Sequence, residues 1–190
     1  YINIRKIIKN KNKTFNKLTL ISNLNTNKAT SKIDVIFSIG LRSKGHKIVL
    51  LLNKKDLFTE ILFKLSGQTK IDYLENYFDK YDISQIDNKI NLLFKNKREF
   101  DLLNYEEDGV RIGRNSLSLA LRKLRIGKIN FENSFHLSEL KRSLRLSFIS
   151  KIASSRLLNE IKPDLVLFVE RGYSPSGELF DLAIRDNIDV

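Results

Sequence analysis

Several residue types on which whole classes of protein depend are scarce or absent in this chain. It has no cysteine, which excludes a disulfide framework and a thiolate metal site. Its only histidines are His46 and His136, so a histidine-rich metal centre is excluded too, and only a site made of carboxylates alone stays open. No apolar run approaches the roughly 18 residues that a membrane-spanning helix needs. We therefore expect no membrane span and no metal centre other than one made of carboxylates.

Glycine-rich phosphate-binding loops are missing as well. No G-x-G-x-x-G follows a predicted strand, and there is no P-loop anywhere in the chain. Dinucleotide-dependent enzymes that modify nucleotide sugars, such as epimerases, are disfavoured for this reason. The aromatic and basic signature of an RRM and the GXXG loop of a KH domain are also absent, so nucleic acid is not the expected partner.

Hydrophobic residues make up 42% of the 190 residues, which is typical of a globular domain with a substantial core. The net charge of +12 is compatible with phosphorylated ligands, nucleic acid or an anionic membrane surface. The alternative is coding bias, because an AT-rich genome by itself gives a chain rich in Lys, Asn and Ile. Residues 1–13 alternate apolar and basic residues, and we interpret them as a solvated terminus or a membrane-surface contact. Residues 14–190 then form the folded domain.

The first half of that domain has the pattern of a βαβ unit. Apolar residues at 18–21 predict a strand, and Thr30 or Ser31 is the candidate cap of the helix that follows. This helix ends at Lys44 and Gly45, and residues 48–52 predict a second buried strand. Such a unit predicts an α/β fold with a Rossmann-like open parallel sheet flanked by helices.

Helices are also predicted further along the chain. Apolar residues at helical spacing indicate helices over 56–65, from Asn115 or Ser116 to 124, over 137–160 with Ser138 as cap, and over 178–185. Residues 83–94 fit a strand, a helix or both. We interpret His46, at the start of a strand, as structural, and His136 as the neighbour of a helix cap, with an active-site role as the alternative.

The stretch from 161 to 181 is the strongest candidate for a functional site. Five apolar residues at 165–169 predict a strand buried on both faces at the centre of the sheet. Ligands of open α/β sheets bind beyond the carboxyl ends of the strands, where the polar loop 170–177 follows. Its candidate binding residues are Glu170, Arg171, Gly172, Tyr173 and Ser174. The alternative is an ordinary connection between a strand and a helix.

Two other groups of residues are candidates for ligand contacts. Ser22 and Asn23 follow the first strand and would lie at the same edge of the sheet. Arg111 and Arg114 begin a basic cluster that could bind phosphates, although a solvated helix face is the favoured explanation. The cluster continues with Arg122, Lys123 and Arg125.

Three stretches, taken in their order and spacing, resemble the N-terminal Rossmann-like domain of GT-B glycosyltransferases. They are residues 43–50 (SKGHKIVL), residues 105–122 with their Gly-Val and Ile-Gly pairs, and residues 162–190 with KPD, GY, Gly177 and Asp181. The similarity is greatest to bacterial enzymes that build capsular and other cell-envelope polysaccharides. Together the stretches cover about a third of the chain.

This resemblance implies two Rossmann-like domains that face a cleft. The N-terminal domain binds the acceptor and often supplies a catalytic base, and the C-terminal domain binds the nucleotide-sugar donor. No metal or cofactor is implied, because the nucleotide sugar is a co-substrate. The chain would be the acceptor half, cytoplasmic and peripheral at the inner face of the membrane. Because residues 187–190 look like the start of a strand, we expect the native protein to continue past Val190 and this part alone to be inactive.

The resemblance also suggests roles for the candidate residues. Glu170 would remove the proton of an acceptor hydroxyl or bind that hydroxyl. The alternative for Glu170 is a salt bridge with Arg171 or with a nearby basic helix. Tyr173 and Ser174 would contact a sugar, Ser22 and Asn23 would line the same cleft, and Arg111 and Arg114 would meet a lipid-linked diphosphate. The competing function is a non-catalytic basic α/β module that binds RNA or an anionic surface.

Overall fold

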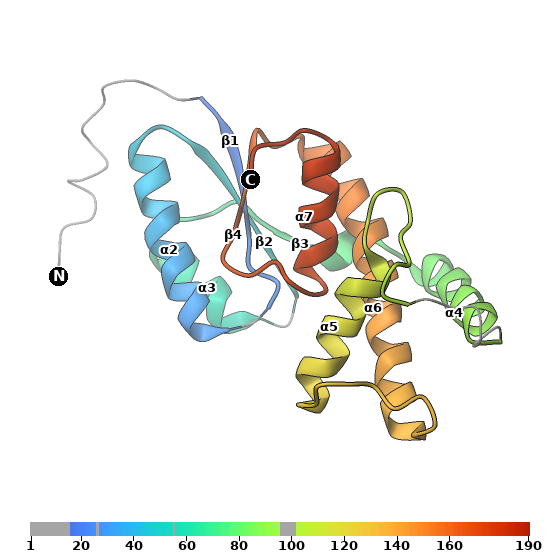
Figure 1. The fold of residues 1–190 in the computed structure, drawn as a ribbon. Coiled ribbons are helices and arrows are strands. Elements are labelled where there is room, and N and C mark those ends of the chain that lie inside the picture. The colour runs from blue at the N-terminus through green and yellow to red at the C-terminus, as the bar shows by residue number, and fades with distance from the viewer. Residues whose placement is uncertain (1–15, 26, 55, 96–101) are drawn as a thin grey trace.

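The chain folds into a parallel sheet with helices on both faces, as Figure 1 shows. The computed structural model describes residues 16–25, 27–54, 56–95 and 102–190, so the predicted basic segment 1–13 lies outside the described residues. All strand pairs are parallel, in the order β3-β2-β1-β4, which confirms the α/β class with a Rossmann-like open sheet. The elements are β1 (Leu18–Ser22), α2 (Lys28–Ser43), β2 (Lys47–Leu52), α3 (Leu57–Leu65), β3 (Ile71–Tyr73), η1 (Leu74–Tyr77), α4 (Lys80–Lys95), α5 (Ile112–Leu124), α6 (Ser134–Ile161), β4 (Leu165–Phe168) and α7 (Ser176–Arg185).

The predicted βαβ unit is confirmed as β1, α2 and β2, but its helix begins earlier than expected. Asn27 is the cap residue, and its side-chain oxygen accepts a hydrogen bond from the backbone N–H of Ala29 at 2.9 Å. The prediction of Thr30 or Ser31 was wrong because both lie inside the first turn. There their hydroxyls donate to the carbonyl of Asn27.

The middle of the chain contains a strand that the sequence did not indicate. β3 has only three residues and pairs with the end of β2, where Leu51 lies opposite Asp72. A strand this short leaves almost no alternation of apolar and polar residues to detect. The ambiguity over residues 83–94 is resolved in favour of one helix, α4.

The longest predicted helix is α6. The predicted cap residue at its start was wrong, whereas its predicted end before Pro163 is confirmed. Asn133 is the cap residue, because its side chain accepts from the N–H groups of Phe135 and His136. The prediction of Ser138 was wrong. The helix ends at Ile161 before Pro163, as the restriction on residues before proline predicts.

The strand β4 is not at the centre of the sheet. It pairs with β1 and stands last in the strand order, so β1 and β2 are the interior strands. Its buried residue is Val166, while Leu165, Leu167 and Phe168 are only half-buried, so the prediction of a strand buried on both faces was wrong. A run of five apolar residues indicates a strand but does not indicate its place in the strand order. Beyond β4, Asp189 forms a single parallel bridge with Leu165.

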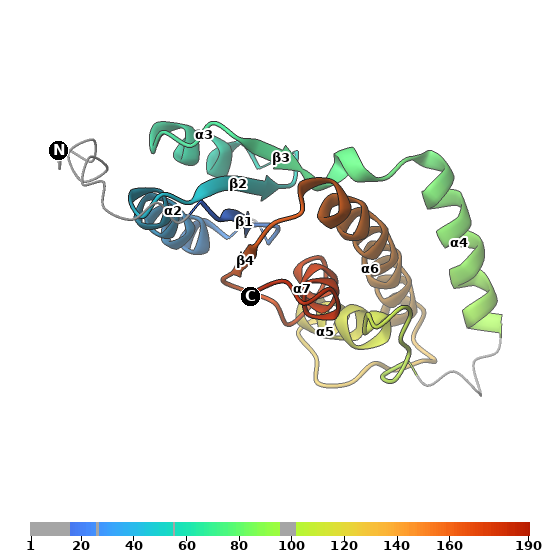
Figure 2. The ribbon, with the colours of Figure 1, turned by 90° about the horizontal axis from the view of Figure 1, so that it is seen from above.

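Alternate strand residues face two separate cores, because side chains of a strand point to opposite faces of a sheet. Leu20 and Leu51 face the larger core, which they share with residues of α4, α5, α6 and α7. Ile21 and Leu50 face a smaller core, where Phe63 of α3 packs on them. Figure 2 shows these two layers, with α2 and α3 on one side of the sheet and α5, α6 and α7 on the other. No helix in the described part of the chain is long and apolar enough to cross a membrane.

Candidate functional site

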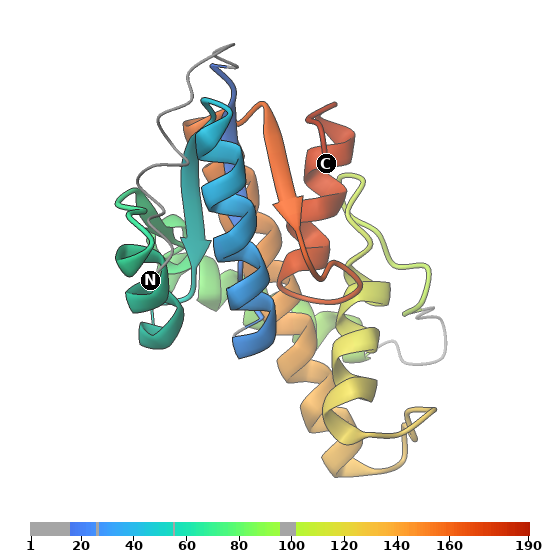
Figure 3. The ribbon, with the colours of Figure 1, turned by 90° about the vertical axis from the view of Figure 1, so that its left-hand side faces the viewer.

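The strand order creates a topological switch point between β1 and β4. From β1 the chain moves outward to β2 and β3, and later returns to the other side of β1 to form β4. The loops after β1 and β4 therefore leave the sheet toward opposite layers, which opens a crevice at the carboxyl edge. Figure 3 shows both strands pointing toward this edge, past which α5 and α6 extend. Ligands of open α/β sheets bind at such a point.

A small hollow lies at this switch point. Its volume is about 10 Å³, which is enough for one water molecule or one hydroxyl group. Sequence reasoning placed Ser22, Asn23 and Glu170 at one edge of the sheet, and the structure brings all three together there. The lining residues are Ser22, Asn23, Leu24, Asn25, Thr30, Asp34, Val169 and Glu170.

Asp34 is the residue of this hollow that sequence reasoning missed. It is 1% exposed, and its Oδ2 accepts a hydrogen bond of 2.6 Å from Asn23 Nδ2. Burial raises the pKa of its carboxyl to about 6, an effect that the hydrogen bond from Asn23 only partly offsets. The available signal was an aspartate within an otherwise apolar helix segment, residues 33–37.

Several buried polar atoms around the hollow have no partner among the residues that the structure describes. They are the hydroxyl oxygen of Ser22, the Oδ1 of Asn23 and the Oδ1 of Asp34. Buried polar groups are normally hydrogen-bonded, so unpaired ones at a hollow indicate a place where water or a ligand group completes them. The arrangement offers two acceptors, from Asn23 and Asp34, and one hydroxyl to a polar ligand atom.

Glu170 closes the other side of the hollow and is held by two neighbours. The hydroxyl of Tyr173 donates to its Oε2, and Arg122 of α5 lies 3.8 Å from its Oε1. The guanidinium of Arg122 also stacks 4.5 Å from the ring centre of Tyr173. Burial and the adjacent Glu170 raise the pKa of the Tyr173 hydroxyl to about 12, so this tyrosine stays protonated as a donor at neutral pH. The carboxylate is 25% exposed and therefore remains open to a ligand.

The contact with Arg122 matches one of the interpretations of Glu170, an ion pair with a nearby basic helix. It does not involve Arg171, whose guanidinium instead lies 4.5 Å from the ring centre of Phe180. At 3.8 Å and with Arg122 57% exposed, the pair is weak. Glu170 is therefore oriented by its neighbours without being occupied by them.

The remaining predicted residues lie apart from the hollow. Arg111 pairs with Asp181, with its Nη2 2.5 Å from Oδ1, and Arg114 is exposed on α5. Gly172 is exposed in the loop after β4. Ser174 is fully buried and donates to Glu178 at 2.5 Å. None of these four residues lines the hollow.

The two histidines have local contacts. His46 Nδ1 lies 2.9 Å from the hydroxyl of Thr19, at the amino end of the sheet. His136 Nδ1 accepts from the backbone N–H of Asn130 in the loop before α6. Within the described residues, no group of three or more His, Asp or Glu side chains could hold a metal ion.

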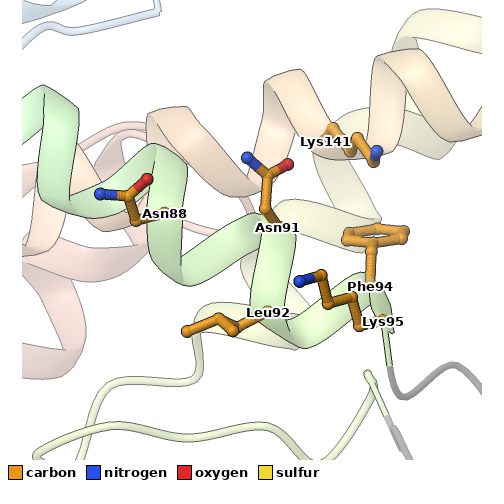
Figure 4. A pocket seen from close by; sticks show the side chains of 6 residues that line it. All are labelled: Asn88, Asn91, Leu92, Phe94, Lys95 and Lys141. Carbon is orange, nitrogen blue, oxygen red and sulfur yellow. The ribbon is translucent and has the colours of Figure 1, made fainter.

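A larger and wide-open hollow lies between α4 and α6, as Figure 4 shows. Its volume is about 720 Å³, and Lys141 lies 5.1 Å from the ring centre of Phe94 within it. No carboxylate, hydroxyl or imidazole is among its lining residues, and its only charged lining groups are the two lysines. The residues that line this hollow are Asn88, Asn91, Leu92, Phe94, Lys95 and Lys141.

Comparison with known proteins gives no relative: no family model, no curated protein and no solved structure matches this chain.

Proposed function

We propose that this chain is the acceptor-binding domain of a glycosyltransferase that transfers a sugar from a nucleotide-sugar donor to a surface polysaccharide or a lipid-linked acceptor. The single observation that carries the proposal is the polar hollow at the switch point between β1 and β4, lined by Ser22, Asn23, Asp34 and Glu170. The resemblance of residues 43–50, 105–122 and 162–190 to GT-B N-terminal domains supports the same conclusion.

The size and polarity of the hollow suit one hydroxyl group of an acceptor sugar. In the proposed transfer, the acceptor oxygen attacks the anomeric carbon of the donor, and the bond from that carbon to the diphosphate breaks. The acceptor proton passes to the carboxylate of Glu170, which is the more open of the two acids. Asp34 acts through Asn23, whose amide it fixes so that the unpaired Oδ1 of Asn23 can accept from a sugar hydroxyl.

The donor is expected to bind outside these residues, in a second domain. A cytoplasmic location at the inner face of the membrane belongs to the same proposal, because nucleotide sugars and lipid-linked acceptors meet there. No metal or cofactor has a role in the proposed chemistry.

Saturation-transfer NMR of the chain with a panel of methyl glycosides of hexoses, N-acetylhexosamines and uronic acids tests the proposal. We expect at least one class to bind with a Kd on the order of millimolar, as is typical of a single small polar ligand. Asn23→Ala and Glu170→Gln should each weaken binding roughly tenfold, because each removes a hydrogen-bonding partner.

The matched control is Glu132→Gln, which removes a carboxylate from an exposed position in the loop before α6. It should leave binding unchanged. Absence of saturation transfer from every glycoside, or equal weakening by Glu132→Gln, would reject the proposal. Binding of unrelated oligonucleotides that falls steeply with salt would instead support the RNA-binding module.

A further inference from the structure

The outward faces of α2 and α3 expose an unusual amount of apolar side chain. On α3, Leu57, Ile61 and Leu65 follow one another at intervals of four residues and are 64%, 57% and 82% exposed. On α2, Ile36 and Phe37 are 69% and 48% exposed. We call these five residues, together with their neighbours Ile33 and Phe58, the α2–α3 apolar surface. Single exposed apolar residues are ordinary, but a continuous group on two adjacent helices marks an interaction surface.

The helix α2 is turned so that its polar side faces the sheet. Its buried residues are Ser31, Asp34 and Ser38. Val35 and Leu41 pack against the smaller core, whereas Ile33, Ile36 and Phe37 are exposed. Two hydrogen bonds hold this orientation. Asn23 at the end of β1 donates to Asp34, and the hydroxyls of Ser31 and Thr59 lie 2.7 Å apart between α2 and α3. The exposure of the apolar side is therefore fixed by specific contacts.

The charges around the α2–α3 apolar surface are mostly positive. Lys28 and Lys32 are exposed one turn apart on α2, and Lys28 lies 5.5 Å from the ring centre of Phe58. Lys64 is exposed on α3 beside Leu65 and pairs with Glu60, the carboxylate of that helix. The carboxylate of α2, Asp34, is buried beneath the helix.

We propose that the α2–α3 apolar surface, with its rim of lysines, docks this protein on an anionic lipid membrane. A bilayer interface accepts protruding apolar side chains, while the lysines reach the anionic headgroups. A second copy of the chain is a poorer partner, because it would place the same lysines against each other. A peptide partner usually needs a groove, whereas these side chains are exposed on two helices.

The position of this surface suits the proposed transfer reaction, and this one point rests on the proposed function. The N-terminal ends of α2 and α3, with Lys28 and Leu57, follow the carboxyl ends of β1 and β2. Docking through the outer faces of α2 and α3 places the domain at the membrane surface, where a lipid-linked acceptor would be found. The membrane contact itself follows from the surface alone.

Co-sedimentation of the full chain with vesicles of phosphatidylcholine, with and without phosphatidylglycerol, tests the inference. We expect binding to the vesicles that contain phosphatidylglycerol and little to phosphatidylcholine alone. Ile36→Ser/Leu65→Ser should reduce binding roughly tenfold. Lys28→Gln/Lys32→Gln should reduce it roughly 30-fold, since each lysine near an anionic surface contributes roughly fivefold.

Matched controls test whether vesicle binding depends on the α2–α3 apolar surface or only on exposed apolar side chains and net charge. Leu92→Ser/Ile184→Ser removes two residues that are 62% and 51% exposed on α4 and α7, and Lys80→Gln/Lys128→Gln lowers the net charge equally. Both should bind vesicles as the unaltered chain does. Circular dichroism should show that all four double variants fold, because their positions are exposed.

Three outcomes would overturn the inference. They are no vesicle binding, equal loss in the control variants, or a dimer in light scattering that Ile36→Ser/Leu65→Ser abolishes while vesicles stay unbound. None of these measurements uses a sugar, so a failure here leaves the glycoside titration to decide the proposed function separately.

Discussion

The layer of α5, α6 and α7 on one face of the sheet and the layer of α2 and α3 on the other differ in what they bury. The first layer presses apolar residues such as Leu140, Leu144 and Leu179 against the sheet and against one another. The second buries hydroxyls and a carboxylate beside a small core around Phe63, and leaves the seven residues of the α2–α3 apolar surface exposed. Both layers cover the same sheet, so stability and function need not come from the same helices.

The first layer also holds buried polar groups, but they serve its packing. Asp181 accepts hydrogen bonds from the backbone N–H and guanidinium of Arg111 and from Asn115, so this carboxylate ties α7 to α5. Glu178 is fully buried and accepts from Ser147 and Ser174, which joins α6, α7 and the loop before α7. In the α2–α3 layer the corresponding groups border a hollow instead. The two layers should therefore respond differently to substitution and to pH.

Glycine-to-alanine substitutions should give the largest difference between the two layers in the change of the free energy of unfolding. A Cβ at Gly113, in the first turn of α5, would lie 1.5 Å from the carbonyl oxygen of Leu102. Neither backbone can move away freely, so Gly113→Ala should lower the free energy of unfolding by more than about 3 kcal/mol. Urea denaturation followed by circular dichroism measures this change.

Gly40→Ala in α2 is the matched control, because nothing lies within 4 Å of a Cβ there. It should raise the free energy of unfolding by roughly 0.5–1 kcal/mol, since alanine is the better helix former. If both variants were equally stable, the tight contact between α5 and the loop before it would not exist.

The buried acid of the first layer should make stability depend on pH. Burial raises the pKa of Glu178 from about 4.5 to about 7, so the native state keeps a proton that the unfolded state loses. The free energy of unfolding should then fall by about 3 kcal/mol as the pH rises from about 4.5 to about 7, and stay level above that. Glu178→Gln, which cannot ionise, should lack this fall.

Urea titrations of both proteins between pH 4 and pH 8 measure the difference. The exposed Glu132→Gln variant should keep the slope of the unaltered chain. Parallel curves for the unaltered chain and Glu178→Gln would show that the carboxyl ionises without cost in the native state.

Asp34, on the opposite face of the sheet, should make the free energy of unfolding depend on pH less strongly than Glu178 does, and at lower pH. Its pKa is raised from about 3.8 to about 6, mainly by burial. Its contribution to stability should therefore fall as the pH rises through this interval, by about 2 kcal/mol because the adjoining hollow admits water. Asp34→Asn keeps an oxygen for the hydrogen bond from Asn23 and should remove this part of the pH dependence.

The same titrations of Asp34→Asn and Glu178→Gln show whether the two acids act in separate pH intervals. Because they lie in different layers and share no partner, the two changes should add in the double variant. A strong departure from additivity would mean that the layers are coupled through the sheet.

Much of this fold could be predicted from local patterns in the sequence. The strands at 18–21 and 48–52 and the end of α6 before Pro163 were predicted correctly, because burial, helical periodicity and proline act over a few neighbouring residues. The placement of Ser22, Asn23 and Glu170 at one edge followed from a general rule, that parallel strands end on the same side of a sheet.

The tertiary structure alone decided the strand order and the rotation of the helices. The run at 165–169 predicted a central strand, but pairing with β1 places β4 last in the strand order, and such pairing joins residues more than 140 positions apart. Ile33, Ile36 and Phe37 of α2 are apolar and lie at helical spacing in the sequence. The contacts of this helix with Asn23 and Thr59 nevertheless leave them on its exposed side. The burial of Asp34 and the α2–α3 apolar surface both follow from that rotation, which depends on contacts between distant parts of the chain.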